Sequence, residues 1–246
     1  MSDSKRFTYE EIFKDKKTIL FFPAHPDDIV VFFGALIRKL IQDKKNVFVV
    51  TVSSGNRGSR ENEVGERELA NKRLDEEKNA LKFLGMPLEN YFNLDHEDGD
   101  VKNDMDLVEE MSFYIRKFKP DLVATHEPTI IYSETYEHNG FFVQHRDHRQ
   151  VGEAVIDSVY PFARNRSFFP EQSKKGLEPF SVYDILLTDE AGANFDFDYT
   201  KEVQNKIDAL KMHASQYDEN SAKDIVDSVK FGDKYLEKFK YLKLLW

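Results

Sequence analysis

Residues 18–28, TILFFPAHPDD, join a short apolar run to a cluster of polar side chains, and this stretch decides the fold that we expect. Residues 18–22 form a short, mostly apolar run without charges, which is typical of a strand that is buried on both faces. Residues 30–43 follow and are apolar at most positions, as expected of a helix that faces a core. A buried strand that leads into a helix is the repeating unit of a parallel sheet.

The same alternation continues along the chain. Further strands are predicted at residues 46–53, 90–94, 121–125 and 183–188. Further helices are predicted at residues 59–84, 104–118, 146–160, 201–217 and 221–243. No repeat or Gly/Ser linker divides the sequence. We therefore expect one α/β domain over residues 1–246, Rossmann-like, with a mostly parallel sheet and helices on both faces.

Residues 126–144 break this pattern. They contain Pro128, several tyrosines, His138 and Gly140, and they show no clean periodicity. The segment is predicted to be a long loop that ends directly before a histidine-rich cluster. Loops of this length commonly carry function or are mobile, and this one suggests a pocket or lid near the site.

The composition limits the chemistry of any metal site. The 246 residues include no cysteine, which excludes disulfides, thiolate nucleophiles, Cys-based zinc sites and iron–sulfur clusters. A metal ion in this protein must therefore be held by His, Asp or Glu.

The charge and the N-terminus limit the partners. Lys and Arg total 35 against 45 Asp and Glu, a net charge of −10, which disfavours nucleic acid as a partner. The N-terminal segment is charged throughout, and the longest apolar run near it, residues 19–22, is too short for a signal peptide core or a membrane span. We expect a cytoplasmic protein with no membrane span, and the sequence leaves a homo-oligomer open.

The first polar cluster follows the first strand. His25 and Asp28 are three residues apart on the turn into the next helix, so an imidazole and a carboxylate could converge on one cation. Asp27 lies beside them, where one aspartate could bind metal while its neighbour stays free as a base. The alternative is a helix N-cap, which an Asp stabilises by about 1 kcal/mol.

A second cluster, Gln144-His145-Arg146-Asp147-His148, begins the predicted helix at residues 146–160. Two histidines at i and i+3 flank an aspartate, although an isolated HxDH is also compatible with a solvated polar turn. Two such clusters at two strand-to-helix junctions of one sheet are harder to explain as unrelated caps. Three of the His and Asp side chains would complete an open catalytic zinc site.

These residues resemble the zinc-dependent LmbE-like N-deacetylases, which are related to N-acetylglucosaminyl-phosphatidylinositol deacetylase and to the mycothiol and bacillithiol pathway deacetylases. The resemblance rests on AHPDD at 24–28 and HRDH at 145–148, and it covers about residues 17–217. The supporting segments are TVSSG at 51–55, the helix from Arg73 to Gly85, KPDLV at 119–123 and HASQY at 213–217.

The resemblance implies roles for individual residues. His25, Asp28 and His148 would bind Zn2+, with Fe2+ or another divalent ion as an alternative, and Asp27 would be the general base. His145 would stabilise the oxyanion and could protonate the leaving amine, with Asp147 orienting it. The implied substrate is a small N-acylated amino sugar, and a bound zinc would lower the pKa of its water to about 7.

The resemblance also implies that Arg73 and Asp98 contact sugar hydroxyls. Each has an alternative: Arg73 could pair with Glu76 or Glu77 on its own helix, and Asp98 could belong to a turn. The chain departs from the family pattern at Ile29, where a glutamate is common, and at Phe32 and Phe33, where small residues are usual. The phenylalanines most simply indicate a differently packed core.

Two other function classes fit parts of the pattern. Two histidines and one carboxylate also describe the facial triad of a mononuclear iron oxygenase, although such a triad is expected on an all-β barrel rather than on this fold. A non-catalytic binding protein could retain the same fold. The retained His and Asp positions favour the metal-dependent N-deacetylase.

Overall fold

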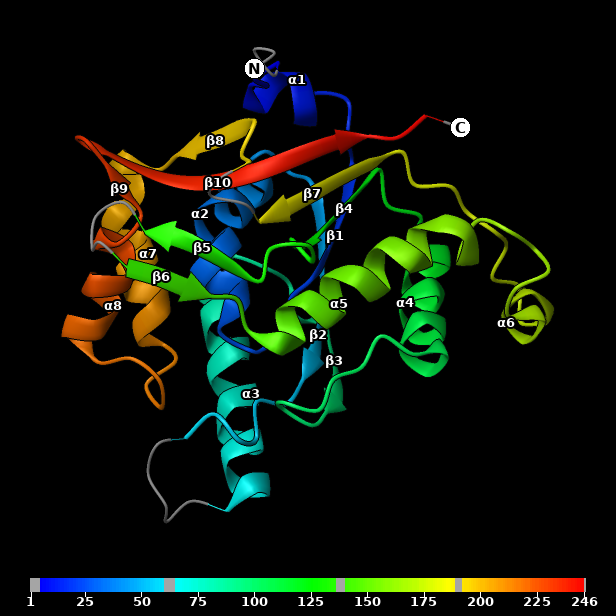
Figure 1. Ribbon diagram of the computed structural model, residues 1–246, viewed down its shortest axis with the longest axis horizontal. Coiled ribbons are helices and arrows are strands. Elements are labelled where there is room, and N and C mark those ends of the chain that lie inside the picture. Colours follow the sequence, from blue (N-terminus) through cyan, green and yellow to red (C-terminus); the bar gives the residue numbers. More distant parts are fainter. Residues whose placement is uncertain (1–4, 60–64, 136–139, 189–191, 246) are drawn as a thin grey trace.

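Five neighbouring strands of the main sheet run parallel, in the order β3-β2-β1-β4-β7 (Figure 1). In the computed structural model, which describes residues 5–59, 65–135, 140–188 and 192–245, these strands span Tyr91–His96, Asn46–Ser53, Thr18–Phe22, Leu122–His126 and Asp184–Thr188. The strand order reverses between β1 and β4, which opens a crevice at their carboxyl ends. The predicted α/β, mostly parallel architecture is confirmed.

Helices cover both faces of the sheet (Figure 1). One face packs against α2 (Asp28–Gln42), α3 (Glu66–Phe83) and α7 (Val203–Lys211). The other face packs against α4 (Met105–Phe118) and α5 (Arg146–Asp157). Strand β1 contributes to the hydrophobic core on both faces of the sheet. Ile19 and Phe21 are buried on the face of α2, and Leu20 and Phe22 are buried on the face of α4 and α5. Burial on both faces explains why this strand is apolar along nearly its whole length.

Shorter elements complete the chain. They are α1 (Tyr9–Phe13), α6 (Pro170–Lys174), α8 (Glu219–Asp227), a π-helical turn at Ser158–Phe162 and 3-10 turns at Leu88–Asn90 and Thr200–Glu202. In the part of the chain that the structure describes, no helix is long and apolar enough to cross a membrane.

The predicted helix at residues 221–243 is wrong beyond Asp227. The segment turns at Gly232, which has φ +62°, and then forms strand β10 (Lys234–Lys243) after the short strand β9 (Lys230–Phe231). Phe239 and Tyr241 are buried and alternate with lysines, which is the period of a strand. Strand β10 runs antiparallel to β7 and to the edge strand β8 (Phe195–Asp198), and so completes the sheet.

The predicted loop at residues 126–144 is also incorrect in part. It contains an antiparallel hairpin of β5 (Tyr132–Thr135) and β6 (Gly140–Val143), which lies apart from the main sheet. Residues 136–139 lie outside the described ranges. The two strands are defined by their pairing with each other, which the mixed polar and aromatic sequence did not predict.

A buried ion pair fixes α2, whose first residue lies in the polar crevice. Lys206 Nζ lies 2.6 Å from Glu237 Oε1, and both side chains are 2% exposed. The Glu237 carboxylate also accepts the backbone N–H groups of Ala35 and Leu36 at 2.8 and 2.9 Å. This pair therefore joins α7, β10 and α2.

Removing one partner leaves a buried charge unpaired, so we expect Lys206→Met to lower the free energy of unfolding by about 3–5 kcal/mol. Urea unfolding followed by circular dichroism measures this change. Lys211→Met removes a surface lysine from the end of the same helix, where it pairs with Glu219, and should have little effect. Equal stability of the Lys206→Met variant and the unsubstituted protein would contradict a stabilising role for the pair.

Candidate active site

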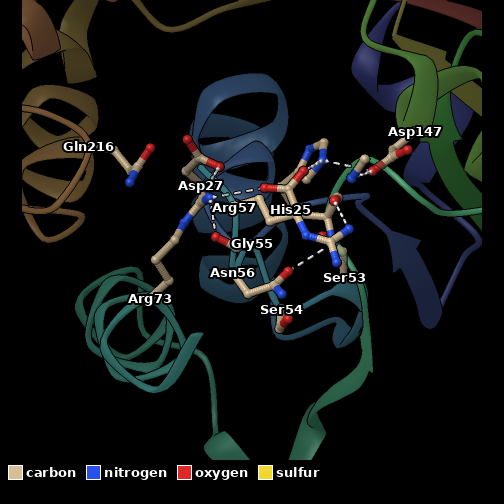
Figure 2. A network of polar contacts seen from close by, with 12 residues as sticks. His25, Asp27, Ser53, Ser54, Gly55, Asn56, Arg57, Arg73, Asp147 and Gln216 are labelled. Atoms are coloured by element: carbon tan, nitrogen blue, oxygen red, sulfur yellow. Dashed lines mark hydrogen bonds and ion pairs between the residues drawn. The ribbon is translucent and has the colours of Figure 1, made fainter. Parts of the chain in front are cut away.

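The polar clusters predicted from the sequence meet at the carboxyl-terminal edge of the parallel strands, where Figure 2 shows His25, Asp27 and Asp147 in one polar network. His25, Asp27 and Asp28 follow β1 at the turn into α2. Residues 145–148 form the start of α5, which packs against β4 and β1. The site therefore lies where the strand order reverses, the usual ligand position in such sheets.

Three buried atoms form a triangle that suits a metal ion. Asp28 Oδ2 lies 3.1 Å from His25 Nδ1 and 3.0 Å from His148 Nε2, and the two ring nitrogens are 3.2 Å apart. Zinc lies about 2.0–2.2 Å from such ligands, so tetrahedral ligands are roughly 3.3 Å apart. The observed separations are close to this value.

The other nitrogen of His25 faces two acids. Its Nε2 lies 3.2 Å from Asp98 Oδ1 and 3.4 Å from Asp147 Oδ2. Burial disfavours the charged ring, but the charge of Asp28 and hydrogen bonds to Asp147, Asp28 and Asp98 outweigh it and raise the pKa of His25 well above its usual value. A cation bound at the triangle would displace the proton from Nδ1, and the Nε2–H that faces the two acids is the arrangement in which a carboxylate orients a metal-binding histidine.

The donor set fits a divalent cation. Burial favours a neutral Asp28, but the charges of His148, His25 and His126 outweigh it and hold the pKa of Asp28 well below its usual range. A carboxylate thus remains ionised between imidazoles in a buried site, and a divalent cation would supply the compensating charge. Two imidazoles and one carboxylate suit Zn2+ and also Fe2+.

His126 lies beside the triangle and supports it. Its Nε2 accepts the Ala24 backbone N–H at 3.0 Å, and its ring stacks on His148 with centroids 4.1 Å apart. Burial, followed by the charge of His148, lowers the pKa of His126 to about 4. Because the Nε2 lone pair is already engaged by the Ala24 N–H, His126 packs beside the triangle as a hydrogen-bonded structural residue.

His145 is the N-cap residue of α5, and its Nδ1 accepts the Asp147 backbone N–H at 3.2 Å. Burial and the charges of His25 and His148 lower the pKa of His145. The neutral ring therefore carries its proton on Nε2. The Asp147 carboxylate was expected to orient His145, but it accepts the Gly99 N–H at 2.6 Å and faces His25 instead. The backbone of Asp147, rather than its side chain, orients His145.

Asp27 occupies the N-cap position of α2 but makes no side-chain cap hydrogen bond. Its Oδ1 accepts from Arg73 Nη2 at 2.7 Å, and its Oδ2 accepts from the Tyr217 hydroxyl at 2.7 Å. Each carboxylate oxygen has two lone pairs, so both oxygens retain capacity for a further donor such as water. The N-cap alternative raised by the sequence is therefore not how this side chain is used.

Neither residue that was expected to contact a sugar is well exposed. The Arg73 side chain is 4% exposed and reaches across from α3 to Asp27 and to the Gly55 carbonyl, 3.0 Å away (Figure 2). The alternative pairing of Arg73 with Glu76 or Glu77 is thus replaced by a contact outside its own helix. The Asp98 side chain is 10% exposed and faces His25.

The departures from the family pattern have different consequences. Ile29 is fully buried in the core, and Phe33 is packed against core aromatics, as predicted. Phe32 is different, because its ring meets the rings of His126 and His148 edge-on at 5.4 and 5.6 Å. Phe32 therefore forms an apolar wall beside the candidate ligand His148.

Sequence reasoning assigned no role to Tyr217. The segment HASQY at 213–217 was noted as family-like, but it lies 190 positions from Asp27 and follows α7 outside the strand-to-helix pattern. His213 in this segment is fully buried, and burial lowers its pKa to about 4. The motif was a signal that the segment approaches the site, but it did not show which side chain makes the contact.

The chain is similar to known sugar deacetylases. The family model described as PIG-L, GlcNAc-PI de-N-acetylase, matches residues 20–159. A diacetylchitobiose deacetylase of Thermococcus kodakarensis is 29% identical over 214 residues, which is 87% of this chain and 75% of that protein.

Solved structures extend the comparison. The N,N'-diacetylchitobiose deacetylase of Pyrococcus horikoshii, complexed with its inhibitor MPG, has a TM-score of 0.84 at 27% identity and covers 95% of this chain and 86% of its own. The hydratase GalB of Pseudomonas putida, which acts on 4-carboxy-2-hydroxymuconate, has a TM-score of 0.70 at 18% identity, covering 92% and 95%. Because a hydratase shares the fold, the reaction must be argued from the site.

Proposed function

Since the chain belongs to the PIG-L family of GlcNAc-PI de-N-acetylases, we propose that it is a metal-dependent hydrolase that removes an N-acyl group, in the first instance acetyl, from an amino sugar or sugar conjugate. The observation that carries the proposal is the buried triangle of His25, Asp28 and His148 beside Asp27. The relatives named above support the choice of substrate class.

The proposed ligands are His25 Nδ1, Asp28 and His148 Nε2, and Zn2+ is the preferred ion. A divalent cation held there would lower the pKa of a water molecule and polarise the amide carbonyl. Asp98 and Asp147 would keep the His25 ring in its ligating orientation by accepting from Nε2. The proposed domain comprises residues 1–246, because Tyr217 and β10 belong to the same site and sheet as the matched residues.

Asp27 is the proposed base. Its carboxylate is next in sequence to a ligand, and each oxygen retains a free lone pair, so it can take the proton of the attacking water. The same carboxyl group can then deliver that proton to the amine nitrogen as the C–N bond breaks. This assignment differs from the expectation that His145 protonates the amine, because a neutral imidazole that donates from Nε2 is a poor acid.

His145 is the proposed oxyanion donor. Its Nε2–H is fixed by the hydrogen bond at Nδ1, and a preorganised donor of this kind is worth about 10²–10³ in kcat. We expect His145→Ala to lower kcat by about this factor with little change in metal content. His145→Gln should recover part of the loss, because its side-chain amide can donate.

Steady-state kinetics with metal analysis tests the role of His145. An unchanged kcat in the His145→Ala variant would exclude the residue from oxyanion stabilisation. A variant that loses its metal would instead place His145 among the ligands.

A substrate panel tests the proposed function as a whole. Purified protein with quantified metal is incubated with N-acetylglucosamine, N,N'-diacetylchitobiose, N-acetylgalactosamine and N-acetylglucosaminyl lipid conjugates, and free amine is measured. Release from at least one sugar amide is expected, while N-acetyl amino acids should be left intact. Release from amino acids alone would contradict the proposed substrate class.

A further inference from the structure

The two carboxylate oxygens of the candidate base, Asp27, each accept a hydrogen bond from a different residue. We propose that Arg73 and Tyr217 are positioning residues that clamp the Asp27 carboxylate. This inference rests on the proposed role of Asp27 as the base. It assigns a function to Tyr217 and adds a positioning role for Arg73.

The Arg73 guanidinium is enclosed by protein. Nη2 donates to Asp27 and Nη1 donates to the Gly55 carbonyl (Figure 2). Asp98 Oδ2 lies 3.8 Å from Nη1. The loop after β2 also packs tightly against this guanidinium. A Cβ built at Gly58 in that loop would lie 2.2 Å from Arg73 Nη1. The Arg73 side chain is only 4% exposed, so its contact with Asp27 is largely shielded from water.

Tyr217 reaches Asp27 from the segment after α7. Burial, together with the charge of Asp27, raises the pKa of the Tyr217 hydroxyl, so it keeps its proton and donates. The segment is anchored to α3, because the Ser215 N–H and hydroxyl donate to the two oxygens of Glu76 at 2.8 and 2.6 Å. Arg73 and Glu76 lie three residues apart on one face of that helix. Arg73 contacts Asp27 directly, and Glu76 anchors the segment from which Tyr217 contacts Asp27.

The clamp explains why Asp27 is not a helix cap. An Asp at an N-cap position usually accepts from the next backbone N–H groups and gains about 1 kcal/mol. Asp27 makes no such bond. Two donors, one of them charged, direct the carboxylate away from the helix. A base displaced by about 1 Å can lose roughly 10²-fold in rate.

Tyr217→Phe and Arg73→Lys test the clamp. Each should lower kcat by about 10–100-fold with KM and metal content nearly unchanged, as for residues that act by orienting another group. Tyr235→Phe and Arg67→Lys are the matched controls, because Tyr235 and Arg67 pair with Asp227 and Asp95 rather than with Asp27. Both controls should keep the full kcat.

A double-mutant cycle tests whether Arg73 and Tyr217 act through Asp27. In the Asp27→Asn background, Tyr217→Phe and Arg73→Lys should each lower kcat by less than a further threefold, because their effect passes through Asp27. A loss in kcat that multiplies in full with the loss caused by Asp27→Asn would show that Arg73 and Tyr217 act independently of Asp27, and would overturn the clamp.

Crystal structures of the two variants test the clamp without any assay. We expect the Asp27 carboxylate to leave its position or to occupy two rotamers in each variant. An unmoved Asp27 in both variants would overturn the clamp. A failure of the unsubstituted protein to release amine from any panel substrate would count against the proposed function, and the crystallographic result would still decide the clamp.

Discussion

Asp27→Asn is expected to lower turnover by about 10³-fold or more while the protein keeps its metal, because the general base is worth roughly 10²–10⁴ in rate. The amide has nearly the shape of the carboxylate, and its oxygen can still accept from Arg73 at Asp27 Oδ1. It cannot take a proton from water. The variant should therefore fold and bind substrate normally but fail at the chemical step.

Acetate release under substrate saturation, together with metal content and thermal unfolding, measures this outcome. Lower activity with lost metal would place Asp27 among the ligands rather than as the base. Turnover within tenfold of the unsubstituted protein would exclude the proposed role.

His148→Ala is the second substitution with a large expected effect. It removes one of three proposed ligands and also the ring that stacks on His126. Loss of a residue that only orients a ligand typically costs 10–100-fold in metal affinity, so removal of a ligand should cost more than about 100-fold. Activity should fall with the metal, by about 10³-fold or more at a fixed, limiting zinc concentration.

Metal content after dialysis, measured by mass spectrometry, checks this prediction. His96→Ala is the matched control, because His96 pairs with Glu110 away from the triangle and its loss should leave the metal in place. A His148→Ala variant with one equivalent of tightly held metal would remove His148 from the ligand set.

The parallel part of the fold could be predicted because each strand carries its own signal. Residues 18–22 are mostly apolar and residues 46–53 are rich in β-branched side chains, and their observed bounds match the predicted ones. The C-terminal part could not be predicted in the same way. Residues 234–243 alternate apolar and lysine side chains, but the lysine-rich composition also suits a helix, and only pairing with β7 and β8 selects the strand.

The candidate ligands could be predicted because the fold brings strand ends together. His25, Asp28 and His148 occur at two strand-to-helix junctions, and the parallel sheet makes those junctions neighbours. The contacts around them depend on side-chain direction, which spacing does not reveal. Arg73 reaches to Asp27 instead of outward, and the backbone of Asp147 rather than its carboxylate orients His145.

The central claim is metal-dependent deacylation of an amino sugar at the site of His25, Asp28 and His148. The most direct test incubates the protein with N,N'-diacetylchitobiose or the best panel substrate and quantifies acetate and free amine together, before chelation, after chelation and after zinc is restored. We predict equimolar acetate and amine, loss of both on chelation and recovery with zinc. Undiminished release after the metal has been shown to be absent, or no release from any sugar amide by fully metallated protein, would contradict the claim.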